Sequence, residues 1–200
     1  MGVFGELNGS GKAFWDRGLS GFNGTGAIVD VGQLVIERMR CITGLGEPEN
    51  GDRFGQGWSR FNDVSETLMS AFPNDSWAGS GADAYGDQNR AQTGRTNAVA
   101  LIDRDVQSVI ARQACQVKYH RDKLDDQAKF LTDLHYMATA LAFVPGVGKA
   151  TKTSVEAAAV NAALEPCRAE VQELSREANQ NAAELQQAVS RYADVAAAAE

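Results

Sequence analysis

Apolar residues recur at steps of three and four in several separate stretches of this chain, which is typical of helices that bury one face. The first stretch, residues 27–42, predicts a helix, and the Gly, Pro and Asn residues of 44–51 predict a loop. A second helix of about five turns is predicted over residues 54–72, with unusually large side chains on its buried face. The apolar positions are Ile28, Val31, Leu34 or Val35, and Met39 in the first helix, and Phe54, Trp58, Phe61, Val64 or Ser65, Leu68 and Phe72 in the second.

The rest of the chain predicts two much longer helices. Residues 81–142 contain no proline and, after Gly81, only the glycines Gly86 and Gly94, so one continuous helix of about sixty residues is expected. The breakers at 144–148 end it, and a heptad pattern then runs over 149–198, where Pro166 either kinks the helix or starts a new one. The heptad positions are Ile110, Val117, Leu124, Leu131 and Ala138 in the first long helix, and Val160, Cys167, Leu174, Asn181, Ala188 and Val195 with Leu164, Val171, Ala178, Leu185 and Tyr192 in the second.

These patterns predict an all-α fold in which the two long helices form an antiparallel hairpin or bundle and the last helix is coiled-coil-like. The expected division is a flexible arm over 1–26, a helical hairpin with a long central helix over 27–142, and a heptad helix over 149–198 that packs back on it. Asn181 falls at a core position, where it either sets the register as a buried polar group or lies exposed.

Composition narrows the possible partners. The formal charge of −7 argues against binding to nucleic acid or to an anionic membrane surface, because both need basic patches. No secretory signal peptide and no membrane span are expected, since no apolar run reaches about 18 residues. The three cysteines are widely spaced, at Cys41, Cys115 and Cys167. We expect buried or idle thiols, with one intramolecular or intermolecular disulfide as the alternative in an oxidising compartment.

Short motifs that suggest catalysis lack the residues that the chemistry needs. His120-Arg-Asp122 resembles part of a kinase catalytic loop, but Gln127 stands where asparagine is required. The fragments at 9–12 and 146–149 lack the first glycine and the hydroxyl residue of a phosphate-binding loop. His120 and His135 lie about four helical turns apart, too far to share one metal ion. We therefore expect no catalytic residues, no metal site and no cofactor, and a protein that is not an enzyme.

The tripeptide Trp77-Ala-Gly79 lies between two predicted helices, after the breakers Pro73 to Ser76. Glycine allows a tight turn, and the indole presents a large apolar surface with one hydrogen-bond donor at the tip of the hairpin. We predict that this tip contacts a partner protein, with Trp77 and Gly79 at its centre. The full set of predicted recognition residues is Trp77, Gly79, Phe72, Tyr85 and Trp58, although Trp58 at its helical spacing is more often a core residue.

The residues around this tip form a longer pattern, Ala71-Phe-Pro-Asn-Asp-Ser-Trp-Ala-Gly-Ser-Gly-Ala-Asp-Ala-Tyr85 followed by Asn89-Arg90. Two more landmarks follow, Ile102-Asp-Arg104 and Phe143-Val-Pro-Gly-Val-Gly148. In this order and spacing they resemble the EspA/EspE family of ESX-1 secretion-associated proteins of mycobacteria, over about residues 55–150. Family members carry a strongly apolar segment beyond the third landmark, where this chain has polar heptads.

The resemblance implies a type VII secretion substrate that is secreted or held at the cell surface, with a cytoplasmic pool before export. In paired substrates of this pathway one member supplies Trp-x-Gly and the other a Tyr-x-x-x-Asp/Glu motif, which none of the four tyrosines here begins. A separate helical partner of the EspC/EspF kind, the secretion apparatus and a homo-oligomer are therefore the expected contacts. The alternative is a cytoplasmic coiled-coil adaptor or chaperone. The residues four positions after the tyrosines Tyr85, Tyr119, Tyr136 and Tyr192 are Asn89, Lys123, Ala140 and Ala196.

Overall fold

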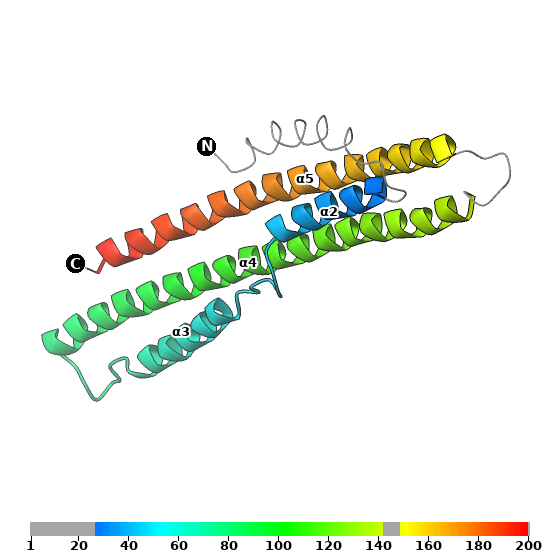
Figure 1. Ribbon diagram of the computed structural model, residues 1–200. Helices are drawn as coiled ribbons and strands as arrows, with labels where there is room; N and C mark the ends of the chain where they lie inside the picture. The colour runs from blue at the N-terminus through cyan, green and yellow to red at the C-terminus, as the bar shows by residue number, and fades with distance from the viewer. Residues whose placement is uncertain (1–26, 142–148, 200) are drawn as a thin grey trace. The chain divides into compact units, whose positions relative to one another are not determined.

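The computed structural model describes residues 27–141 and 149–199, where the regular secondary structure is helical with no strand (Figure 1). The all-α prediction is confirmed. The predicted arm over 1–26 and the predicted turn over 144–148 lie outside the described residues. The helices of the described ranges are α2 (Ala27–Ile42), α3 (Asp52–Ser70), α4 (Ser80–Leu141) and α5 (Lys149–Ala197).

The helices assemble into two compact units, each containing one short helix and parts of the two long ones. The first unit contains α2 with residues 119–141 of α4 and 149–173 of α5. The second contains α3 with residues 80–118 of α4 and 174–197 of α5. Within each unit α4 and α5 run antiparallel. The pairs that show this are His120–Glu170 and Lys152–Thr139 in the first unit, and Arg112–Asn181 and Arg191–Asp105 in the second.

In the first unit, α2 approaches α4 and α5 most closely at Gly32. A Cβ at this position would lie 2.9 Å from Cγ2 of Val160 and 3.0 Å from Cδ1 of Leu131. The buried face is therefore centred on the glycine, and Ile36 one turn later is only 1 % exposed. Of the two alternatives for the buried face, Leu34 is 46 % exposed and Val35 packs against the core, so the structure selects Val35.

Polar groups are also buried between α4 and α5 of the first unit. Nδ1 of His120 lies 2.6 Å from Oε2 of Glu170. Glu156, whose side chain is 3 % exposed, has Lys152 Nζ at 3.6 Å and His135 Nδ1 at 3.7 Å from its Oε1. Each histidine of α4 thus faces a glutamate of α5, and the described residues contain no cluster of three potential metal ligands.

In the second unit, α3 makes its closest approach to α4 through small residues, while Phe54 packs against the hydrophobic cluster beside them. A Cβ on Gly55 would lie 2.5 Å from Nε2 of Gln107, and one on Gly57 would overlap the carboxylate of Asp103. Ser65 is the buried residue of α3, whereas Trp58 is 39 % exposed. The predicted buried face is therefore wrong for Trp58, whereas Phe54 is half-buried and packs against the cluster of α4 and α5. The helices are so close that only small residues fit between them, and the aromatic side chains lie beside the contact.

The last helix is continuous from Lys149 to Ala197, with Pro166 inside it. Asn181 was predicted to be either a buried polar group or exposed. It is 4 % exposed, so the buried alternative is confirmed. None of the described helices is long and apolar enough to cross a membrane.

Candidate partner-recognition site

The α3–α4 turn holds Trp77 in place through hydrogen bonds of its own backbone and side chains. Asn74 Oδ1 accepts hydrogen bonds from the backbone N–H and the hydroxyl of Ser76, at 3.1 and 2.6 Å. The N–H of Trp77 donates to the carbonyl oxygen of Asn74 at 2.9 Å. This local pattern is the usual way in which asparagine and serine stabilise a turn. It places the indole immediately before α4 begins.

Gly79 supplies the backbone conformation that leads from the turn into α4. Its φ is +106°, a value that residues with a side chain rarely adopt. An added Cβ would meet no atom within 4 Å, so the requirement for glycine comes from the backbone and not from packing. The carbonyl oxygen of Gly79 then accepts the N–H of Asp83 at 3.1 Å in the first turn of α4.

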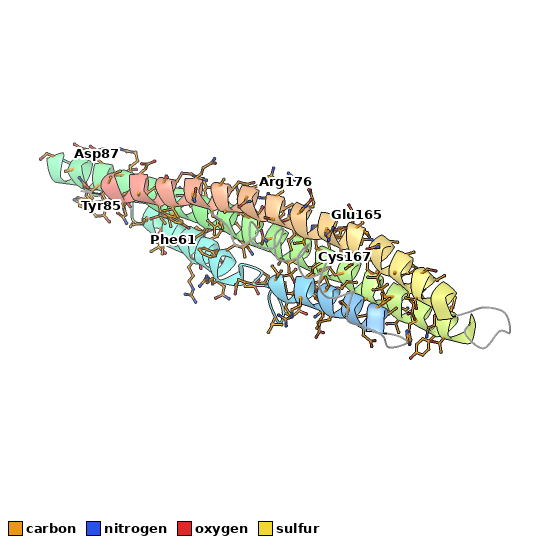
Figure 2. The ribbon with its side chains drawn as sticks, turned by 45° about the horizontal axis from the view of Figure 1, so that its top comes forward. Phe61, Tyr85, Asp87, Glu165, Cys167 and Arg176 are labelled. Carbon is orange, nitrogen blue, oxygen red and sulfur yellow. The ribbon has the colours of Figure 1, made fainter. Side chains whose placement is uncertain are left out.

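Trp77 and Tyr85 form an aromatic pair at this turn. Their ring centroids are 4.9 Å apart with the planes inclined by 42°. Both remain partly open to solvent, with 47 % of Trp77 and 41 % of Tyr85 exposed. Figure 2 shows Tyr85 near the start of α4. The structure thus brings together two of the residues predicted from the sequence. They form an exposed apolar surface that carries two polar groups, the indole N–H and the tyrosine hydroxyl.

Phe72 lies in the same turn and contacts a different part of α4. It is half-buried, and the guanidinium carbon of Arg90 lies 5.9 Å from its ring centroid. Arg90 Nη1 also contacts Asp87 Oδ1 at 2.6 Å. Because the Arg90–Asp87 ion pair is well exposed, its own contribution to stability is small.

Asn89 joins the two helices of the hairpin, and the sequence did not identify it as a site residue. It is 5 % exposed, and its Nδ2 donates to the carbonyl oxygen of Leu68 at 2.7 Å. The same carbonyl oxygen also accepts the N–H of Ala71 at 3.2 Å, so Asn89 adds a second hydrogen bond at the C-terminal end of α3. The signal in the sequence was present, since Asn89 is part of the family-like pattern that begins at Ala71. Only the structure shows which carbonyl it reaches.

Trp58 lies apart from the turn. It is twelve residues before the end of α3, about 18 Å along the helix at 1.5 Å per residue. There it borders an open depression together with Gly55, Ser59 and Gln107. The structure therefore brings Trp77, Gly79, Phe72 and Tyr85 into one turn and its flanks, and places Trp58 elsewhere on α3.

Residues 43–126 match the EspA/EspE family. The chain is 37 % identical over 169 residues to the ESX-1 secretion-associated protein EspE of Mycolicibacterium smegmatis, covering 84 % of the chain and 32 % of that relative. It is 30 % identical over 172 residues to the ESX-1 secretion-associated protein EspA of Mycobacterium tuberculosis, covering 86 % of the chain and 44 % of the relative.

The chain therefore spans about a third of the length of the first relative and less than half of the length of the second. No solved structure matches it. The family match contains the whole α3–α4 turn with Trp77, Gly79 and Asn89, and the relatives extend the similarity to most of the chain. Through residues 43–126, the chain belongs to the EspA/EspE family.

Proposed function

We propose that this protein is a type VII secretion substrate that pairs with a helical partner for export and acts outside the cytoplasm through protein–protein contacts. The observation that carries the proposal is the exposed Trp77–Tyr85 pair in the α3–α4 turn, within the segment that matches the family. The relatives' description as ESX-1 secretion-associated proteins supports the pathway.

The proposed mechanism is burial of an aromatic anchor in a partner. An exposed indole next to a second ring offers a large rigid surface at little cost in side-chain entropy, and such residues often dominate binding energy. The contacts that hold the turn, Asn74 to Trp77 and Asn89 to Leu68, would present this anchor in one geometry before binding. We propose residues 27–142 as the recognition part and residues 149–198 as the helix that supports it.

The partner in this proposal is a separate helical protein with a Tyr-x-x-x-Asp/Glu motif, of the EspC/EspF kind, and the pair is recognised by the secretion apparatus. Export would leave a cytoplasmic pool before secretion and a secreted or surface-held form after it. Self-association is a secondary part of the proposal. A catalytic role is not part of it.

The test is export of Trp77→Ala in a mycobacterial host with ESX-1 intact or deleted. We expect export of the unaltered chain to require ESX-1, and Trp77→Ala to lower export at least about tenfold while helical content by circular dichroism stays unchanged. Phe130→Ala is the matched control, because it removes an exposed ring on α4 (42 %) outside the turn. Trp58→Ala shows whether recognition extends along α3.

Two results would contradict the proposal. If the chain stays in the cytosol in every strain, the cytoplasmic adaptor or chaperone becomes the better explanation. If Trp77→Ala is exported as well as the unaltered chain, the turn is not the recognition element.

A further inference from the structure

In the first unit, α4 has an exposed face that carries two aromatic rings. Tyr119 is 55 % exposed and Phe130 is 42 % exposed. Between them, Lys123 and Asp126 continue the same face at steps of four, three and four residues, and both are exposed. Helices of a coiled coil pack on each other through residues at this spacing. We call these four residues the outer stripe.

The two charges of the outer stripe differ from other charges on α4 in having no ion-pair partner. Asp125 faces α2, where its Oδ1 lies 2.7 Å from Nε of Arg40. Lys123 and Asp126 form no ion pair with any residue of the part of the chain that the structure describes. Nζ of Lys123 lies 5.4 Å from the centroid of the Tyr119 ring, so the cation stays on the stripe. The outer stripe thus presents two rings and two opposite charges to solvent.

The order of the outer stripe is ring, cation, anion, ring, and it is complementary to itself only when it is reversed. An antiparallel second copy places Tyr119 against Phe130 of the other copy, and Lys123 against Asp126. Each pair then occurs twice, because the two-fold axis of such a dimer repeats it. A parallel copy would place lysine on lysine and aspartate on aspartate. Charge complementarity therefore favours a second copy of this chain in the antiparallel direction.

Two exposed charges beside the outer stripe follow the same rule. Asp122 and Lys129 border the stripe on one side of α4. Antiparallel packing brings Asp122 of one copy next to Lys129 of the other, at the positions that flank the seam of a coiled coil. The complementarity thus extends from the seam to its border, which a helix face that only contacts solvent does not require.

We propose that two copies of this chain associate through the outer stripe, with their α4 helices antiparallel. The proposed function includes self-association, and this inference assigns a surface to it without depending on export. From Tyr119 to Phe130 the stripe is about 17 Å long, or three helical turns. A contact of this size is at the small end of specific interfaces, so the dimer should dissociate on dilution.

The test is the dissociation constant of the dimer, measured on the purified chain by sedimentation equilibrium over a range of concentrations. Lys123→Glu or Asp126→Lys alone should raise this constant at least about tenfold, because each places like charges in contact twice. The double variant Lys123→Glu with Asp126→Lys exchanges the two charges and should restore the constant to within about twofold. The two single variants should also associate with each other when mixed, since one then supplies two anions and the other two cations.

Matched controls for these charge changes lie on α3. Arg60→Glu and Asp63→Lys change exposed charges of the same order and spacing, and neither should alter the dissociation constant. Phe130→Ala should weaken the dimer while being exported normally, which separates self-association from recognition at Trp77. A chain that stays monomeric at every concentration, or a double variant that associates no better than the single ones, would overturn the inference. Either result would leave the proposed role of Trp77 in export unchanged.

Discussion

At the scale of single residues, Asn181 shows how a buried polar group fixes the pairing of two long helices. Its Oδ1 accepts from Nε and Nη2 of Arg112 at 3.0 and 2.9 Å. Its Nδ2 donates to the amide oxygens of Gln113, at 2.5 Å, and Gln116, at 2.7 Å. A shift of α5 by one heptad along α4 would separate all these groups. The network therefore specifies one register among several that apolar heptads alone would allow.

Replacing Asn181 by alanine should destabilise the second unit by about 1–3 kcal/mol, because Arg112, Gln113 and Gln116 would lose their buried partner. Urea unfolding followed by circular dichroism measures the change. Asn179→Ala is the matched control, since Asn179 is exposed on the same helix and alanine has the higher helix propensity. The control should be neutral or slightly stabilising, and equal effects of the two substitutions would contradict the role of the network.

At the scale of elements, both short helices contact the long pair through glycines. Gly32 of α2 and Gly55 of α3 each leave no room for a Cβ, whereas Gly94 of α4 has no atom within 4 Å of that position. Glycine in a helix costs about 0.5–1 kcal/mol relative to alanine. At Gly32 and Gly55 that cost is offset by close helix packing, and at Gly94 it is not.

Alanine substitutions at two helical glycines should therefore have opposite signs. Gly32→Ala should destabilise the protein by about 1–3 kcal/mol, because Val160 and Leu131 must move to accommodate the methyl group. Gly94→Ala should stabilise it by about 0.5–1 kcal/mol. Thermal unfolding of the two variants beside the unaltered protein gives the comparison. A stabilised Gly32→Ala protein would show that α2 packs less closely than the structure has it.

Helical periodicity was enough to predict the helices but not their closest contacts. The bounds of α2 and the continuous α4 follow from the sequence, because steps of three and four persist through each stretch. Helical spacing assigned Trp58 to a buried face and left Leu34 or Val35 open on the other, but Trp58 and Leu34 are both exposed. Small residues make the closest contacts between the helices instead. Which glycine lies against another helix depends on how the two helices approach each other, and helical periodicity does not specify this.

At the site, the breakers and Trp77-x-Gly79 of the sequence indicated the turn, and the positive φ of Gly79 agrees with the use of glycine there. The contact between the Tyr85 and Trp77 rings could not be predicted, since it depends on how the turn enters α4. The same holds for Asn89, whose acceptor Leu68 is 21 residues away.

At the scale of the whole molecule, the three cysteines differ in their access to solvent. Cys41 and Cys115 are exposed and Cys167 is buried, and all three are free thiols. Burial, with a smaller contribution from the charge of Glu170, raises the pKa of Cys167 to about 11. Because the thiolate is the reactive form, Cys167 remains protonated and unreactive at pH 8 in the folded protein.

Two thiols should therefore react with Ellman's reagent at pH 8 in the native protein, and the third only when the first unit unfolds. In urea all three should react, and the delayed fraction should follow the unfolding curve. Cys167→Ser should remove the slow phase alone and serves as the control. Three equally fast thiols in the native protein would contradict the burial of Cys167.

Each unit combines segments that are far apart in the chain, and this has a consequence for synthesis. Gln33 of α2 donates to Thr132 of α4, 99 residues later. At a ribosomal rate of about 5–20 residues per second, α2 waits roughly 5–20 s for this part of α4, and longer for Val160 of α5. During that interval the apolar face of α2 has no long helix to cover it. A nascent chain of this kind is a natural client for holding chaperones at the ribosome until both long helices have emerged.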